Sequence, residues 1–122
     1  MTASFKRTIK SRLSELEQEL LRSLDDQRKE YEELTLGDRT EETDEASIRN
    51  EERALSALLH HDRRRLLRVQ SALARIRNGH YGICAVCGGS IGEKRLEAQP
   101  DTVFCYTCAK RRERAVHQAH LN

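Results

Sequence analysis

All four cysteines of this 122-residue chain stand in two pairs of identical spacing, and this pattern constrains the fold more than any other feature. Cys84 and Cys87 form the first pair and Cys105 and Cys108 the second, which gives the arrangement Cys-x2-Cys-x17-Cys-x2-Cys. Two cysteines separated by two residues can direct both thiolates at one ion, and the whole spacing lies in the range of four-cysteine zinc sites. Gly88, directly after the first pair, supplies the backbone freedom that the turn of such a site needs. The sequence therefore predicts one zinc ion with four cysteine ligands.

Two other interpretations of the cysteines fit the sequence less well. Disulfide frameworks belong to secreted proteins, and we expect no secretion because the first residues lack the apolar core of a signal peptide. A redox-active Cys-x-x-Cys motif would be set in a β-α-β pattern, which surrounds neither pair. Four cysteines fill a tetrahedral shell and leave no position for a water molecule. We therefore expect a structural zinc ion and a protein that is not an enzyme.

The composition argues against a broad apolar core. Only 37% of the residues are hydrophobic, 34% are charged, and there is no tryptophan. A chain of this polarity has to fold around narrow apolar seams and a metal. No apolar run approaches the length that spans a bilayer. Because reduced thiols and zinc suit the cytoplasm, we expect a cytoplasmic protein without a membrane partner.

Two long segments carry the spacing of amphipathic helices. Residues 4–36 repeat apolar side chains at steps of three or four, and Gly37 ends the run. Residues 44–77 carry a heptad stripe in which Glu52 and Asp62 are the polar members. The stripe of the first helix comprises Ile9, Leu13, Leu16, Leu20, Leu24, Gln27, Tyr31 and Leu34, and that of the second includes Ile48, Leu55, Leu59, Leu66, Val69, Leu73 and Ile76.

Two helices with one narrow stripe each and a short connection are expected to pack as an antiparallel hairpin. We therefore predict a mainly α fold with two parts. A long coiled-coil hairpin occupies residues 1–78, with its tip near 37–46. A four-cysteine zinc ribbon at the base of the hairpin and a short C-terminal helix, over about 106–119, occupy residues 79–122. Pairing of the helices between two chains is the alternative, but the short turn favours a monomer.

Residues 81–100 resemble the signature of the DksA/TraR family. The segment reads Tyr-Gly-Ile-Cys-Ala-Val-Cys-Gly-Gly-Ser-Ile-Gly-Glu-Lys-Arg-Leu-Glu-Ala-Gln-Pro, and the helical hairpin before it agrees with the family layout. The family signature is an aromatic residue-Gly-x-Cys-x-x-Cys-Gly, an Ile, then Arg-Leu-x-Ala-x-Pro and a second Cys-x-x-Cys. The resemblance implies a transcription regulator that binds bacterial RNA polymerase directly through the secondary channel. It also implies no sequence-specific binding to DNA.

The same resemblance assigns a regulatory tip. The tip motif of the family is Asp-x-x-Asp-x-Ala, and an acidic residue of this tip alters the stability of promoter open complexes. Counting back from Cys84 places the second Asp at Asp44 and the Ala at Ala46. Glu41 stands in place of the first Asp, which keeps the charge but lengthens the side chain by one methylene. Acids at this point also suit the first turn of a helix through its dipole, which is the simpler explanation of the remaining acids here.

The resemblance further implies a contact with the nucleotide ppGpp at the base of the hairpin. Arg68 retains the positive charge at one matching position, and Arg95 and Lys110 are further candidates for contact with ppGpp or polymerase. Gln99 and Ala109 replace two basic residues of the family. Since a polyphosphate site depends on such charges, we expect ppGpp to bind weakly.

Two other functions are compatible with the residues. A zinc ribbon with an arginine-rich base could bind nucleic acid through phosphate contacts. A coiled coil stapled by zinc could also serve as an adaptor for an unrelated protein. Binding to DNA alone, measured at several salt concentrations, separates the first of these from a factor that copurifies with RNA polymerase.

Overall fold

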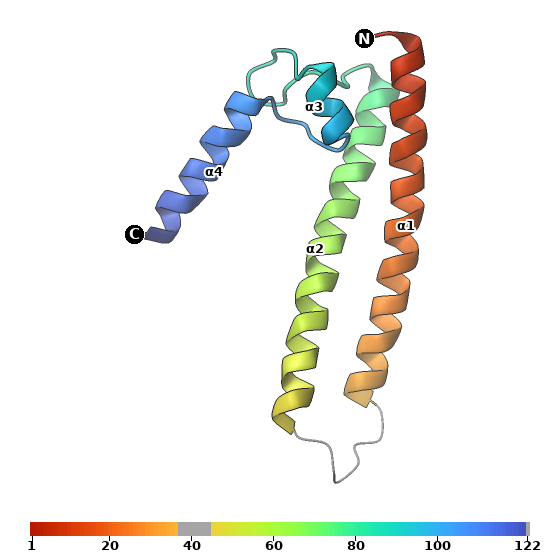
Figure 1. Cartoon of the computed structure of the whole chain (residues 1–122), viewed down its shortest axis with the longest axis vertical. Coiled ribbons are helices and arrows are strands. Elements are labelled where there is room, and N and C mark those ends of the chain that lie inside the picture. Colours follow the sequence, from red (N-terminus) through yellow and green to blue (C-terminus); the bar gives the residue numbers. More distant parts are fainter. Residues whose placement is uncertain (37–44, 122) are drawn as a thin grey trace. The chain divides into compact units, whose positions relative to one another are not determined.

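A computed structural model of the chain describes residues 1–36 and 45–121. Its four helices are, in chain order, α1 (Ala3–Leu36), α2 (Glu45–Asn78), α3 (Glu93–Ala98) and α4 (Tyr106–Leu121) (Figure 1). The described residues form no β-strand, and one antiparallel bridge pairs Ile83 with Ser90. The predicted mainly α class is confirmed. None of the described helices combines the length and the apolar character that crossing a membrane requires.

The chain divides into two compact units, and each contains a part of α1 beside a part of α2. One unit comprises Met1–Ser14 together with Arg68–Asn122, and the other comprises Glu15–Leu67. The sequence suggested a division after residue 78, where the zinc-binding segment begins. This domain boundary stays a prediction.

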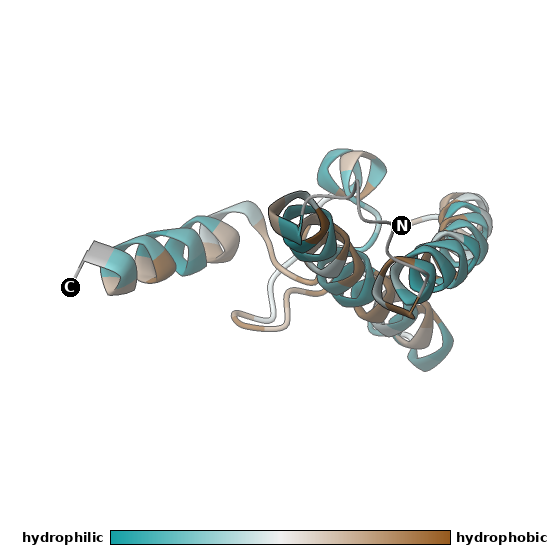
Figure 2. Cartoon of the chain, turned by 90° about the horizontal axis from the view of Figure 1, so that it is seen from below, coloured by the Kyte–Doolittle hydropathy of each residue, from teal (hydrophilic) through white to brown (hydrophobic). Residues whose placement is uncertain are grey.

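Within the unit Glu15–Leu67, the helices pack through the predicted apolar stripes. Leu20, Ile48 and Leu59 are buried, with 8% exposure or less. Hydrophilic residues cover most of each helix, and hydrophobic residues recur at intervals along it (Figure 2). The seam is therefore narrow, as the composition required.

A polar pair interrupts this seam where the sequence placed a glutamine and an aspartate. The Nε2 group of Gln27 donates hydrogen bonds to Asp62 Oδ2 and to Ser23 Oγ, both at 2.9 Å. Gln27 is 9% exposed, and its Oε1 atom has no hydrogen-bond partner among the described residues. The hydrogen bond from Gln27 is the main reason that the pKa of Asp62 lies below its usual value. The carboxylate of Asp62 therefore stays ionised inside the hairpin.

In the unit that carries the cysteines, the start of α1 packs on the end of α2. Ile9, Leu13 and Val69 are at most 1% exposed, and Ala72 is fully buried beside them. The heptad stripe missed Ala72 because an alanine outside the a and d positions gives no hydrophobic signal of its own.

The C-terminal end of α2 fixes where the zinc-binding segment begins. The N–H of His80 donates to the Arg75 carbonyl at 2.9 Å, and the N–H of Gly79 donates to the Ile76 carbonyl at 3.3 Å. This pair of bonds is the Schellman motif, which needs a left-handed residue after the helix. Gly79 supplies it with φ 77°. The helix α2 therefore ends at Asn78, one residue beyond the predicted segment 44–77.

The short helix α3 was not anticipated from the sequence. It lies between the two cysteine pairs and buries Leu96, which is 1% exposed. Six residues make fewer than two turns, so no periodic stripe could reveal them. The helix ends before Gln99 because a residue that precedes proline avoids the helical conformation.

Candidate metal centre

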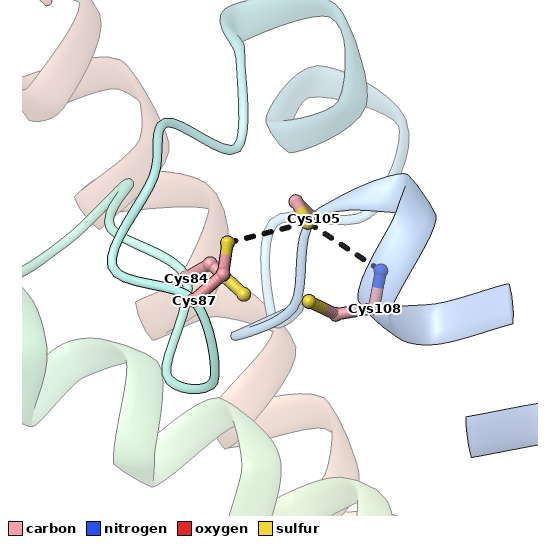
Figure 3. A group of neighbouring side chains, drawn as sticks. All are labelled: Cys84, Cys87, Cys105 and Cys108. Atoms are coloured by element: carbon pink, nitrogen blue, oxygen red, sulfur yellow. Dashed lines mark hydrogen bonds between the residues drawn. The ribbon is translucent and has the colours of Figure 1, made fainter. Parts of the chain in front are cut away.

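The four cysteines come from two separate segments and meet at one point. Cys84 and Cys87 lie in the loop that follows α2, Cys105 directly precedes α4, and Cys108 lies in its first turn (Figure 3). Their four sulfur atoms all lie within 4.8 Å of one another. Cys84 and Cys108 are buried, whereas Cys87 is exposed. The two cysteine pairs therefore form one cluster with one side toward solvent.

The dimensions of this cluster fit a zinc ion. The Sγ atoms of Cys87 and Cys105 are 3.8 Å apart. A tetrahedral zinc ion with zinc–sulfur bonds of about 2.3 Å has sulfur–sulfur edges of about 3.8 Å. Four thiolates are also the donor set of structural zinc sites, and they leave no coordination position open.

Backbone N–H groups are directed at the sulfur atoms of both pairs. The N–H of Gly89 donates to Cys87 Sγ at 3.4 Å, and the N–H of Cys108 donates to Cys105 Sγ at 3.5 Å. Gly88, with φ 73°, provides the turn that brings the first of these donors back toward its cysteine. Hydrogen bonds of this kind favour the thiolate form, which is the form that binds metal.

The pKa values of two of the cysteines move in opposite directions. Backbone hydrogen bonds from Cys87 and Cys105 are the main cause that lowers the pKa of Cys84 to about 6. The hydrogen bond with the Cys105 side chain, followed by burial, raises the pKa of Cys108 to about 12. Thiols this close together resist joint ionisation because like charges repel. A divalent cation at their centre removes this repulsion, so the cluster is suited to hold one.

The loop around the cluster is fixed by backbone hydrogen bonds. The N–H of Cys84 donates to the Gly89 carbonyl, and the N–H of Ala85 donates to the Val103 carbonyl, both at 2.8 Å. The second bond joins the segments that carry the two cysteine pairs. These bonds hold the two cysteine pairs beside each other.

Side chains attach this loop to the segment after α3 and to α2. The hydroxyl of Tyr81 donates to the Pro100 carbonyl at 2.8 Å, and the Arg75 guanidinium donates to the Ile83 carbonyl. Tyr81 is 5% exposed, and burial is the main cause that raises its pKa to about 12. The zinc-binding segment is therefore packed on the end of α2.

Of the predicted tip residues, only Ala46 lies in the described part of the chain. It is exposed in the first turn of α2. Asp44 and Glu41 lie outside the described residues. Their role as the regulatory tip stays a prediction.

The predicted basic contacts are occupied by other groups of the chain. Arg68 Nε lies 3.3 Å from Asp101 Oδ2, and Arg95 Nε donates to the Phe104 carbonyl at 3.0 Å. Lys110 Nζ lies 3.4 Å from Glu113 Oε2. It also lies 5.5 Å from the centroid of an aromatic ring, that of Tyr106.

A groove between α4 and the segment before it gathers several of the predicted residues. Arg95 and Lys110 line it together with Gln99 and Ala109, the two positions without a basic residue. Arg68 is not one of the lining residues. The structure therefore brings two of the three predicted basic residues to one groove and places the third at a different contact.

Sequence reasoning missed the acid that pairs with Arg68. Asp101 follows Pro100 directly, and a Pro-Asp step is a common signal for a turn. That signal could have indicated the turn. It could not have indicated that the turn faces α2, which carries Arg68.

Comparison with known proteins gives the same class of molecule. Residues 79–114 match the family model of the prokaryotic dksA/traR C4-type zinc finger. An uncharacterised protein of Aquifex aeolicus (strain VF5) is 47% identical over 49 residues, which are 40% of this chain and 34% of that protein. The match thus spans about a third of the length of this relative.

A solved structure extends the comparison to the hairpin. The fold is similar to that of transcription factor DksA2 from Pseudomonas aeruginosa, with a TM-score of 0.81 and 26% sequence identity. The similarity covers 96% of this chain and 89% of that one.

Fold and metal centre together define a helical hairpin that carries a structural C4 zinc finger. Residues 79–114 form a zinc finger of the prokaryotic dksA/traR C4 type, and the chain as a whole is similar in fold to DksA2. The predicted family resemblance, the hairpin with its zinc ribbon and C-terminal helix, and the single structural zinc ion are confirmed.

Proposed function

We propose that this protein binds bacterial RNA polymerase through the secondary channel and alters the stability of promoter open complexes. The observation that carries this proposal is the similarity to transcription factor DksA2 over 96% of the chain. A zinc finger of the same family supports it, since the family-model match contains all four cysteines. The polymerase contact follows from the family resemblance.

In this proposal the two helices and the zinc finger provide the contacts with RNA polymerase, and the tip changes the stability of the open complex. The helices offer a larger contact area than the few residues between them. A carboxylate at the tip acts through charge or hydrogen bonding on the catalytic-centre magnesium, its ligands or nearby mobile elements of polymerase. Asp44 is the residue that we assign to this role, with a lesser contribution from Glu41. Ala46 places a small side chain beside the acid, and a larger residue at this position would crowd it.

Asp44→Asn tests the proposal because it keeps the size of the side chain and removes its charge. We expect polymerase binding to stay within a few-fold of the unmodified protein, since one exposed charge contributes at most about 1 kcal/mol. We also expect most of the change in open-complex lifetime to disappear. The assay is transcription in vitro from a ribosomal RNA promoter with purified polymerase, with and without ppGpp.

Glu42→Gln is the matched control. It removes one charge from a neighbouring acid that the tip motif does not include, so regulation should be retained. Full activity of Asp44→Asn at equal polymerase occupancy would show that the acids only stabilise the helix. Failure to copurify with core polymerase would reject the proposed partner.

We expect ppGpp to add little to the effect and the protein to act as a monomer. Two of the family's basic positions are uncharged, at Gln99 and Ala109. A ppGpp affinity of the polymerase complex that falls sharply on Arg68→Ala would contradict this expectation. Sedimentation of the free protein tests the oligomeric state.

Nucleic-acid binding is a second candidate because α4 carries exposed basic residues. Arg111 and Arg114 are exposed, and the Arg112 guanidinium lies 4.4 Å from the centroid of the Phe104 ring. Phosphate contacts make affinity fall steeply with salt. Binding to DNA without polymerase, with a steep salt dependence that α4 variants reduce, would favour this function.

A further inference from the structure

A tight turn after α3 holds one acidic residue in a fixed position. The N–H of Thr102 donates to the Gln99 carbonyl at 3.1 Å, which closes a four-residue turn with Pro100 second and Asp101 third. Proline favours the second position of such turns because its φ is already fixed. The Tyr81 hydroxyl holds the Pro100 carbonyl at 2.8 Å. The backbone that carries Asp101 is therefore anchored from outside the turn as well as within it.

The turn directs Asp101 at α2. Its Oδ2 atom lies 3.3 Å from Arg68 Nε, and the two residues are 33 positions apart in the sequence. The side chain of Asp101 is 16% exposed, whereas that of Arg68 is 51% exposed. The acid is thus the more enclosed partner of the pair.

A second arginine and a tyrosine belong to the same electrostatic environment. Burial is the main cause that raises the pKa of Tyr81; the positive charge of Arg12 on α1 lowers this pKa, and the negative charge of Asp101 raises it. The charge of Asp101 therefore acts on Tyr81 as well as on Arg68.

A guanidinium that already holds a carboxylate offers fewer donors to an incoming anion. We propose that Asp101 is an internal counter-anion that occupies Arg68 and closes this position to phosphate-bearing ligands. A free anion has to displace a carboxylate that the turn keeps in place, and this carboxylate also repels it. Asp101 is thus a specificity-determining residue. The consequence of Asp101 for ppGpp binding rests on the proposed function. The effect of Asp101 on the binding of anions in general does not rest on it.

Asp101→Asn in the full zinc-loaded chain tests this proposal without polymerase. Asparagine keeps the size of the side chain and suits the same turn. Inorganic tripolyphosphate is the probe, and its dissociation constant is measured by NMR titration at low ionic strength. We expect binding about five-fold tighter than in the unmodified protein, the size of effect typical of one partly exposed ion pair. Adding Arg68→Ala to Asp101→Asn should remove this gain.

Asp25→Asn is the matched control for the change in net charge. Asp25 also pairs with basic side chains, at 2.9 Å from Arg28 and 3.1 Å from Lys29. It belongs to the unit Glu15–Leu67, whereas Arg68 belongs to the other unit, so its loss should leave the affinity that the Arg68 signals report in the titration nearly unchanged.

Three results of the affinity measurements would overturn the proposal. They are no gain in Asp101→Asn, an equal gain in Asp25→Asn, and a gain that persists after Arg68→Ala. Asp101→Ser serves as a second variant, since serine also suits turns. If neither variant retains zinc and helical content, Asp101 is a structural residue and the proposal is rejected. Because polymerase is absent from this experiment, its failure is distinct from failure of the proposed function.

Discussion

Removing the carboxylate of Asp62 should destabilise the hairpin, because this carboxylate accepts a hydrogen bond within the apolar seam. Asp62→Ala deletes the acceptor of the 2.9 Å hydrogen bond from Gln27. Hydrogen bonds to charged groups contribute about 1.5–3 kcal/mol to the free energy of unfolding. The Asp62 side chain is 14% exposed, so water replaces part of the lost bond. We expect a loss near the lower end of that range, about 1.5–2 kcal/mol.

Replacing both members of the pair should reverse this loss. Gln27→Leu with Asp62→Leu removes the hydrogen bond, the charge in the seam and the Gln27 Oε1 atom, which has no partner in the described part of the chain. A buried oxygen without a partner costs about 1–3 kcal/mol, and exchanging buried polar pairs for apolar ones is often neutral or stabilising. We expect the double variant to be at least as stable as the unmodified protein.

The assay is urea unfolding of the zinc-loaded protein, followed by circular dichroism. Amide hydrogen exchange around Asp62 adds a local measurement, because the pair lies within the unit Glu15–Leu67. The pKa of Asp62 is lowered in the folded state. Its contribution is therefore complete above the unfolded pKa and is lost as pH falls through the folded value. Asp62→Ala within about 0.5 kcal/mol of the unmodified protein, less than one net hydrogen bond, would refute this reasoning.

Three further predictions concern the metal centre, its support and the hairpin. Cys105→Ser should lose most of the zinc and loosen the residues after α2, which metal analysis and amide exchange report; an unchanged one-to-one zinc content would contradict the four-ligand site. Tyr81→Phe should lose about 1 kcal/mol of stability with the bond to the Pro100 carbonyl. The folded pKa of Tyr81 is raised to about 12 from 10.0, so its contribution to stability is complete below pH 10.0 and is lost as pH rises toward 12. Between these pH values the free energy of unfolding should therefore fall less steeply in Tyr81→Phe than in the unmodified protein. A cysteine pair at Leu20 and Leu59 should crosslink within one chain, and crosslinks found only between mixed chains would show a dimer.

The features predicted from the sequence are those that local rules decide. The two long helices follow from apolar side chains at steps of three and four. Each observed helix end lies within one residue of the expected end. The zinc site follows from the chemistry of four thiols in two pairs. Gln27 and Asp62 could be placed in the seam because the heptad stripe passes through them, although their hydrogen bond was not foreseen.

The features that the sequence did not reveal depend on contacts between distant segments. Arg68 meets Asp101 only because the turn after α3 lies against α2, and no periodic pattern reports such packing. Ala72 is fully buried because of its place between helices. The short helix α3 is stabilised by the burial of Leu96 and not by a stripe of its own. Residues 41 and 44 fall outside the described chain, so their assignment still depends on the family motif.

The two helices of the hairpin have equal lengths, since α1 and α2 each contain 34 residues. Because the two arms are equally long, their seam residues pair in a fixed register along the hairpin. An insertion in one arm alone shifts every later seam residue out of register with its partner. A heptad removed from each arm keeps the same faces in contact and shortens each helix by about 10 Å. Changes of length that preserve folding should therefore occur as matched sevens in both arms, and the distance that the tip reaches should change in discrete steps.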